Sequence, residues 1–147
     1  MISRTDNSSE GQILRTLRRH GLSVTQTRRR ILRLFLEQSG ALAHGDIEKR
    51  IGGGIDRVTL YRNLQRFTEK GIIHAIPTPD NAIRYALCRE ECEEGHHHDH
   101  HIHFFCTCCR KTYCLDDVVT PDIRMPRGYR TEQVEVLVQG VCRSCSA

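Results

Sequence analysis

Apolar residues recur at helical spacing along the first third of the chain. Ile13, Leu14 and Leu17 predict a short amphipathic helix over residues 12–20, ended by Gly21. A second helix is expected from Thr25, whose hydroxyl can cap it, because apolar residues follow at i, i+3 and i+4: Ile31, Leu34 and Phe35. Arginines give the other faces of that second helix a positive charge.

Two further helices are expected before the pattern changes. The third covers about residues 44–51 and ends at the glycines 52–54. Asp56 can cap a fourth over residues 57–70, stopped by Gly71. Three apolar residues of this fourth helix fall within an arc of about 60° and form its expected buried side: Leu60, Leu64 and Phe67.

Strand patterns follow. Residues 72–76 and 83–87 predict two strands joined by the turn-rich residues 77–81. Helices two to four followed by this hairpin predict a winged helix-turn-helix domain over residues 1–87, with the fourth helix expected in the major groove of DNA.

The second half predicts a small α/β domain over residues 88–147. Strands are expected over 102–105, 112–115 and 134–139, with a helical or turn segment over 116–123. The fold class is therefore α+β.

Charge divides the chain unevenly, although the net charge is only +4. Residues 1–78 hold 14 Lys/Arg against 7 Asp/Glu, whereas residues 79–147 hold 8 against 11. A basic half suits a polyanion such as DNA. On charge alone, a basic solvated face without such a role remains the alternative.

The cysteines and histidines concentrate in the other half. All eight cysteines and six of the nine histidines lie between Cys88 and Cys145. Residues 1–10 lack the apolar core of a signal peptide, and no run of about 18 apolar residues occurs. We therefore expect a cytoplasmic protein with no membrane partner, whose thiols are available to metal.

Two Cys-x2-Cys pairs give the strongest chemical signal. Each pair can present two thiolates to a tetrahedral zinc, so a structural Zn²⁺ is predicted on Cys106, Cys109, Cys142 and Cys145. Free or disulfide-bonded cysteines are the alternative. A thioredoxin-like redox role is disfavoured because neither pair opens a helix after a buried strand.

A histidine run precedes the first pair. His101 and His103 alternate along an expected strand and so share one face, which makes half a metal site. Cys114, Cys88 or His74 could complete it. The alternative is a His-rich linker that solvates the hinge or buffers metal, in the extreme case a metal storage protein.

At this point the pattern resembles the ferric uptake regulator family. The resemblance rests on residues 21–28, 57–64 and 71–73, and on His101-x-His103-x2-Cys106-x2-Cys109 with Cys142-x2-Cys145. It implies a homodimeric repressor that binds a double-stranded DNA operator, with a structural zinc and a regulatory metal at the hinge. It also implies the DNA-binding residues Arg57, Thr59, Tyr61, Arg62 and Arg28.

The regulatory site departs from the iron-sensing pattern. Two positions that supply a His and a Glu ligand in iron-sensing members correspond to Ala41 and Ala86. The zinc-sensing pattern implies a regulatory hinge site formed by Cys88, His101, His103 and His74. Cys114 and His100 are candidate further ligands. Added thiolate favours Zn²⁺ over Fe²⁺ or Mn²⁺.

We therefore expect a zinc-responsive repressor with no small organic substrate. An iron or peroxide sensor of the same family is the first alternative, because oxygen ligands such as Glu90, Asp99 or Asp116 are available. A zinc enzyme is disfavoured, since nucleobase deaminases need a His-x-Glu arrangement that the chain lacks.

Overall fold

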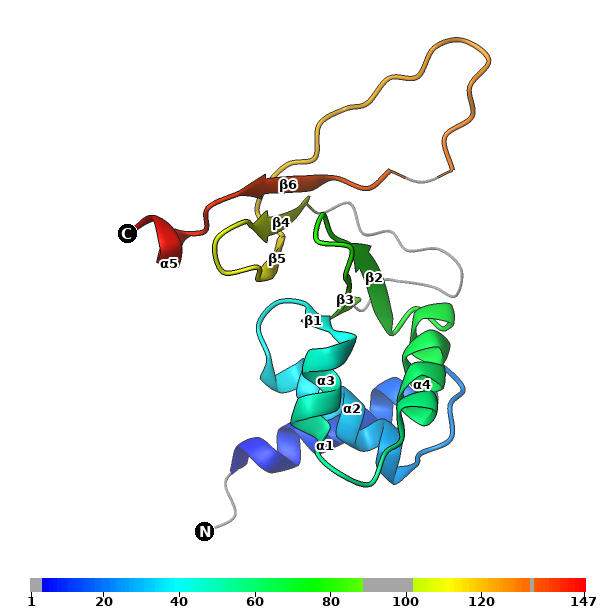
Figure 1. The fold of residues 1–147 in the computed structure, drawn as a ribbon. Helices are drawn as coiled ribbons and strands as arrows, with labels where there is room; N and C mark the ends of the chain where they lie inside the picture. Colours follow the sequence, from blue (N-terminus) through cyan, green and yellow to red (C-terminus); the bar gives the residue numbers. More distant parts are fainter. Residues whose placement is uncertain (1–3, 89–101, 133) are drawn as a thin grey trace. The chain divides into compact units, whose positions relative to one another are not determined.

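The computed structural model describes residues 4–88, 102–132 and 134–147, with side chains from residue 8 onward. The chain divides into two compact units, Met1–His98 and Asp99–Ala147, and each is described by itself (Figure 1). The boundary between the units falls among residues that the structure does not describe. The proposed limits of 1–87 and 88–147 therefore stay a prediction.

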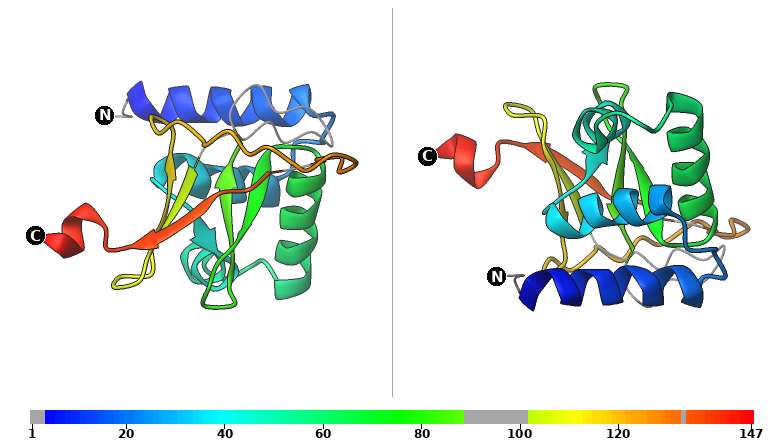
Figure 2. Two further views of the ribbon diagram at one scale, coloured as in Figure 1. Left: turned by 90° about the horizontal axis from the view of Figure 1, so that it is seen from above. Right: turned by 90° about the horizontal axis from the view of Figure 1, so that it is seen from below.

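Four helices build the first unit. They are α1 (Arg4–Arg19), α2 (Gln26–Glu37), α3 (His44–Ile51) and α4 (Arg57–Glu69). Helix α1 lies alongside α2, and α4 crosses them at a steep angle (Figure 2). No helix in the described part of the chain is both long and apolar enough to span a membrane.

The first helix begins eight residues earlier than its apolar pattern predicts. Its first turns carry no apolar stripe, so hydrophobic spacing gives no sign of them. Glu10 instead forms ion pairs with Arg29 and with Arg33 (2.7 Å to the latter), which tie this part of α1 to α2. The pattern revealed only the part of α1 that packs into the core.

The predicted caps are confirmed. The Thr25 side chain accepts from the backbone N–H of Arg28 at 3.3 Å, and that of Asp56 accepts from the N–H of Thr59 at 2.9 Å. Gly21 has φ of +66°, a left-handed conformation that costs glycine little, and the chain leaves α1 there.

A three-stranded antiparallel sheet completes the first unit. Its order is β1 (Leu42–Ala43), β3 (Ile83–Leu87), β2 (Ile73–Pro77). The hairpin β2–β3 was predicted. Strand β1 was not, because two residues are too few to show alternation; its existence depends on Leu42 pairing with Tyr85.

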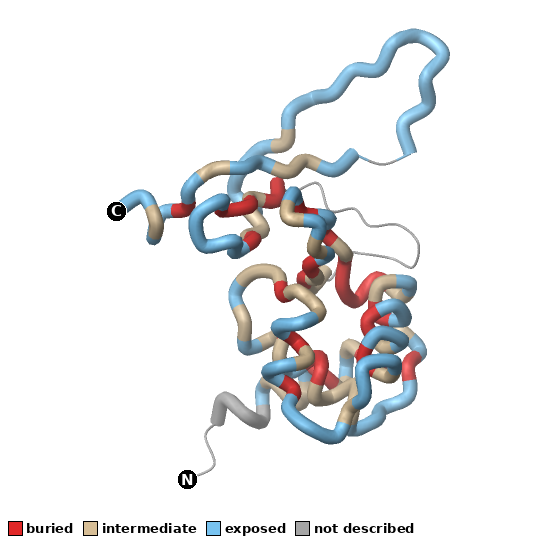
Figure 3. Tube along the Cα trace, in the orientation of Figure 1, coloured by how far each residue is buried: buried red, intermediate tan, exposed pale blue. Residues whose placement is uncertain are grey.

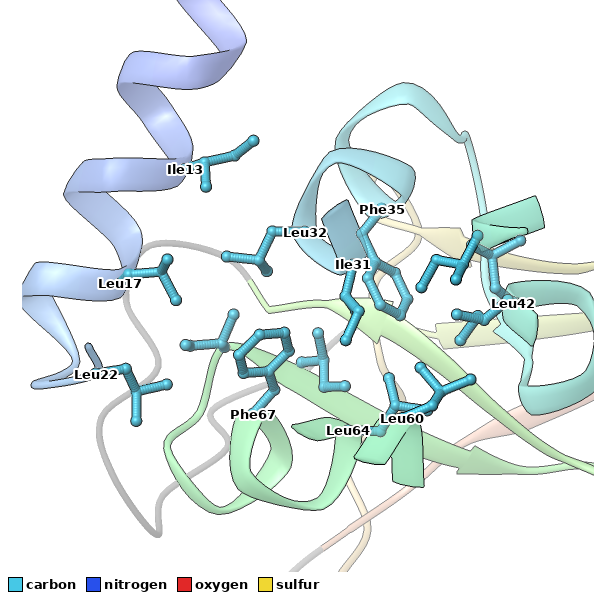
Figure 4. Packing of buried hydrophobic residues seen from close by; sticks show 14 residues of the cluster. Ile13, Leu17, Leu22, Ile31, Leu32, Phe35, Leu42, Leu60, Leu64 and Phe67 are labelled. Atoms are coloured by element: carbon cyan, nitrogen blue, oxygen red, sulfur yellow. The ribbon is translucent and has the colours of Figure 1, made fainter. Parts of the chain in front are cut away.

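The core of the first unit joins all four helices to this sheet (Figure 4). The predicted apolar face of α4 is buried, and helices α1 and α2 contribute matching side chains. Figure 3 colours the buried residues red. The core residues include Ile13, Leu17, Ile31, Leu32, Phe35, Leu42, Ile47, Leu60, Leu64, Phe67 and Ile73.

The second unit is a small sheet with one short helix. The strand order is β5 (Thr112–Leu115), β4 (Ile102–Cys106), β6 (Leu137–Gly140), followed by α5 (Arg143–Ser146). Strands β4 and β5 are antiparallel, whereas β4 and β6 are parallel. The chain thus combines helices with two small sheets, and the α+β prediction is confirmed.

One expectation for the second unit was wrong in detail, and another, which left helix and turn open, is resolved as a turn. The last strand begins at Leu137 rather than 134, because pairing with β4 starts only at His103 opposite Leu137. Residues 116–123 open with a turn and contain no helix. Their side chains are largely exposed, so no apolar stripe faces a core there.

Candidate nucleic-acid interface and metal centres

Helix α4 has one buried and one exposed face. Leu60, Leu64 and Phe67 are at most 1% exposed, so this face of the helix packs into the core of the first unit. The opposite face is basic and aromatic. Tyr61 is 54% exposed and lies among further exposed side chains of the same helix: Arg57, Val58, Arg62, Gln65 and Arg66. Such a face can contact both phosphates and base edges.

Thr59 serves the start of α4. Its hydroxyl donates to Oδ2 of Asp56 at 2.6 Å, while its backbone N–H donates to Oδ1. These hydrogen bonds lower the pKa of Asp56. The structure thus gives Thr59 a capping contact, alongside the DNA contact that its motif implies.

Arg28 holds α2 against α4. Its Nη1 donates to the carbonyl and the hydroxyl of Ser23 at 2.8 and 2.6 Å, and its Nε donates to Oδ1 of Asn63 at 3.3 Å. Asn63 in turn donates to the carbonyl of Thr59. The sequence motif identified Arg28 but gave no sign of Asn63, because the two residues are 35 positions apart.

A carboxylate from α3 meets the first residue of α4. Glu48 accepts from Nε of Arg57 at 3.4 Å and from Nη2 at 3.3 Å. The Nδ1 atom of His44 lies 3.9 Å from the same carboxylate. These side chains border an open hollow of about 540 Å³ that Tyr61 also lines. Sequence reasoning missed Glu48, since only tertiary packing places it beside Arg57.

The two Cys-x2-Cys pairs come together in the second unit. The Sγ atoms of Cys106, Cys109, Cys142 and Cys145 all lie within 4.8 Å of one another. Cys106 ends β4, and its register partner Gly140 leads directly to the second pair. The parallel strand pair therefore brings together thiols that are 33 residues apart in sequence.

The spacing of these sulfurs fits a shared metal. Cys109 and Cys142 lie 3.8 Å apart, and all four cysteines are free thiols. Zn–S bonds of about 2.3 Å in a tetrahedron separate sulfurs by about 3.8 Å, whereas a disulfide needs about 2.0 Å. The four residues thus suit a tetrahedral zinc.

Backbone groups prepare the thiols for ligation. The N–H groups of Cys109 and Cys142 point at Sγ of Cys106 (3.5 and 3.3 Å) and lower its pKa to about 6. A hydrogen bond from the backbone of Cys145 lowers the pKa of Cys142. The phenol of Tyr113 donates a hydrogen bond to the sulfur of Cys142, which raises the pKa of Tyr113 to about 12. At Cys106 and Cys142 the thiolate, which is the metal-binding form, is therefore favoured, whereas hydrogen bonding with the Cys142 sulfur raises the pKa of Cys145.

In the first unit, two predicted regulatory ligands lie together. Sγ of Cys88 and Nδ1 of His74 are 3.6 Å apart. The backbone N–H of Cys88 donates to the carbonyl of Ile72 at 2.9 Å, which holds the thiol beside β2 just after β3 ends. Nitrogen and sulfur at this separation can share a metal ion.

In the second unit, His103 and Cys114 are direct cross-strand partners in β4 and β5. Directly opposed side chains of an antiparallel pair lie on the same face about 5 Å apart at Cβ. This pair forms a second candidate half-site. His100 and His101 lie outside the described residues. Cys108, which lies in the sequence between the two cysteines of the first pair, is exposed.

Comparison with known proteins gives the family. The Ferric uptake regulator family matches residues 19–138. No curated protein matches the sequence.

Solved structures share the fold. A zinc uptake regulator complexed with zinc and DNA has a TM-score of 0.67 at 19% identity, over 98% of this chain and 96% of the other. The ferric uptake regulator of Vibrio cholerae gives 0.61 at 20% identity, over 87% and 98%. A zinc-bound manganese uptake regulator gives 0.62 at 20% identity, over 88% and 98%. The family match over residues 19–138 shows that the chain belongs to the ferric uptake regulator family of metal-responsive transcription regulators.

Proposed function

We propose that this protein is a zinc-responsive, dimeric repressor that reads DNA with α4. The observation that carries the proposal is the face of α4, where Arg57, Tyr61 and Arg62 project opposite a buried apolar side. Helices α2 to α4 and the hairpin β2–β3 would act as a winged helix. The excess of basic residues in the first 78 residues supplies the attraction to phosphate.

The second unit would hold two copies together. Its surface carries apolar side chains that a small soluble domain rarely leaves in water, among them Val119 (88% exposed), Tyr129 (73%) and Val141 (52%). A second copy is the occupant that the family relationship favours. Two copies would present two α4 helices to the half-sites of a palindromic operator.

A structural zinc would be held by Cys106, Cys109, Cys142 and Cys145. The spacing of their sulfurs and the lowered pKa values of Cys106 and Cys142 support this ligand set. When bound, zinc supplies folding free energy to the unit that holds it.

The regulatory site would draw on both half-sites. His74 and Cys88 come from the first unit, and His103 with His101 or Cys114 from the second. Ligation by both units would restrict the hinge and favour the arrangement in which two α4 helices match successive major grooves. In the metal-free protein the first units would sample many arrangements, so affinity for the operator would fall.

Zinc is the effector that this ligand set favours. Thiolate and imidazole suit zinc, whereas ferrous iron and manganese sites are richer in oxygen ligands. The half-sites offer sulfur from Cys88 and Cys114, and alanine occupies both positions 41 and 86.

The test combines metal titration with two substitutions. Operator duplex selected from a randomised library is titrated with the wild-type protein and with the variant C88S/H103A at fixed salt, using Zn²⁺, Fe²⁺ and Mn²⁺ in turn. We expect zinc to raise wild-type affinity at least about tenfold, and to leave the folded, dimeric variant unresponsive.

Other outcomes would identify the alternatives. A response to Fe²⁺ or to peroxide, but not to Zn²⁺, would identify an iron or peroxide sensor. Weak binding of several metals without salt-sensitive DNA affinity would identify a storage protein. A zinc response that survives in C88S/H103A would show that the regulatory ligands are wrong.

A further inference from the structure

Arg57 differs from the other exposed arginines of α4 because a carboxylate from another helix holds it. Arg57 is the first residue of α4, and its side chain is 77% exposed. Glu48, on α3, is 38% exposed and contacts two different nitrogens of the guanidinium. Arg66, near the other end of α4, contacts Glu69 of its own helix through one nitrogen.

The contact with Glu48 uses one edge of the guanidinium and leaves another open. Arginine carries five N–H donors in a planar fork. The edge formed by Nε and Nη2 faces Glu48. The remaining edge, formed by Nη1 and the second hydrogen of Nη2, keeps two parallel donors. Guanine offers two matching acceptors, O6 and N7, in the major groove.

Glu48 also changes what Arg57 is suited to bind. A phosphate contact depends on net positive charge, which the neighbouring carboxylate reduces. A base contact depends on the position and direction of the donors, which a two-point contact fixes. The hollow beside Arg57, lined by Val58 and Tyr61, leaves space for a base edge to approach.

We propose that Glu48 is a positioning residue that holds Arg57 to read a guanine in the major groove. This inference rests on the proposed DNA-binding function of α4. It assigns recognition of a DNA base to Arg57 and a supporting role to Glu48 of α3, a helix that no sequence motif connects with DNA.

The experiment measures base discrimination by the full-length, zinc-loaded protein. The probe is the duplex selected from a randomised library, with each base pair replaced in turn. Arg57→Ala identifies the base pair that Arg57 reads. We expect Glu48→Ala to lower discrimination at that same pair about tenfold, and to have no further effect on discrimination when Arg57 is already alanine.

Glu69→Gln is the matched control. It removes one negative charge beside an arginine of the same helix, so it should raise affinity for every duplex to a similar extent and leave discrimination unchanged. Glu48→Gln, which keeps an acceptor oxygen, should retain more discrimination than Glu48→Ala. Circular dichroism checks that each variant is folded.

Three results would overturn the inference. Unchanged discrimination in Glu48→Ala, or an equal loss in the presence and absence of Arg57, would show that Glu48 does not act through Arg57. Selective DNA binding that Arg57→Ala leaves intact at every position would remove Arg57 from base reading while the proposed function stands. If the zinc-loaded wild type selects no duplex, both the proposed function and this inference fail.

Discussion

Arg84 shows how a basic residue can belong to the unit proposed to bind DNA and yet have its side chain engaged by its own turn. It is the only Lys or Arg in the hairpin β2–β3. Both its Nη atoms contact Asp80 at 2.8 Å, and it also contacts Thr78. The Thr78 hydroxyl donates to the same carboxylate at 2.7 Å. The sequence predicts a turn here, but its spacing does not reveal that the turn closes on its own arginine.

The Asp80–Arg84 pair predicts a pH-dependent contribution to stability. Hydrogen bonds from Arg84 and Thr78 hold the pKa of Asp80 well below its ordinary 3.8. Because the folded-state pKa is depressed, the contribution is complete well above pH 4 and is lost as pH falls below it. Asp80→Asn should therefore lower the free energy of unfolding by about 1–2 kcal/mol at pH 7. At pH 3 this loss should be smaller by about 1 kcal/mol.

Urea unfolding of the metal-free protein, followed by the helical signal of the first unit, measures both values. Glu69→Gln is the control, because Glu69 lies in the same unit and pairs with Arg66 at 3.3 Å where both side chains are about half exposed. It should change stability little at either pH. An equal effect of Asp80→Asn at pH 7 and pH 3 would contradict the assignment.

At the scale of elements, the sequence was informative wherever an element makes its own signal. Helix α3 was predicted to the residue, and α4 ends one residue before its predicted end, because Gly52 follows α3, Asp56 caps the start of α4 and Gly71 follows its end. Strand β1 and the first turns of α1 depend on partners elsewhere in the chain: Tyr85 for β1, Arg29 and Arg33 for α1. No local pattern can encode such partners.

Helix α1 should contribute to stability through one face. Leu17 is fully buried in the core, whereas Leu14 is only partly buried outside it. Leu17→Ala should lower the free energy of unfolding by about 2–4 kcal/mol, because it removes packed methyl groups and leaves a cavity. Leu14→Ala, the same chemical change on the same helix, should cost less than half as much. Chemical denaturation compares them, and equal losses would show that α1 is not docked as described.

At the scale of the whole molecule, the sequence predicted DNA binding in the first half and metal binding in the second. Its metal ligands could be predicted only where a short motif contains them. The four-cysteine cluster was predictable because each pair carries its own spacing. The family resemblance put His74 and Cys88 in one site, whereas their spacing in the sequence did not, since their contact depends on the register of β2 beside the end of β3. Effector identity depends on the complete ligand set, and no single motif in the sequence specifies that set.

Substitution should distinguish the four zinc-binding cysteines from Cys108, which is not expected to bind zinc. Cys106→Ser should abolish zinc binding at this cluster and unfold the second unit, because the thiolate supplies folding free energy there. The first unit has its own core and should keep its helical signal. Metal analysis and size-exclusion chromatography measure the zinc content and the dimer. Cys108→Ser is the control: it should keep both, and loss of zinc in this variant would give Cys108 a ligand role.

The parallel pairing of β4 with β6 has a consequence for how the second unit responds to its surroundings. Parallel strands are usually joined through a helix that packs on the sheet; here the described residues between β5 and β6 contain no helix. The metal cluster at the end of the strand pair would take over this role. By mass action, each tenfold fall in free zinc would then weaken this unit by about 1.4 kcal/mol. The persistence of the assembled repressor would itself follow zinc supply, independently of the hinge.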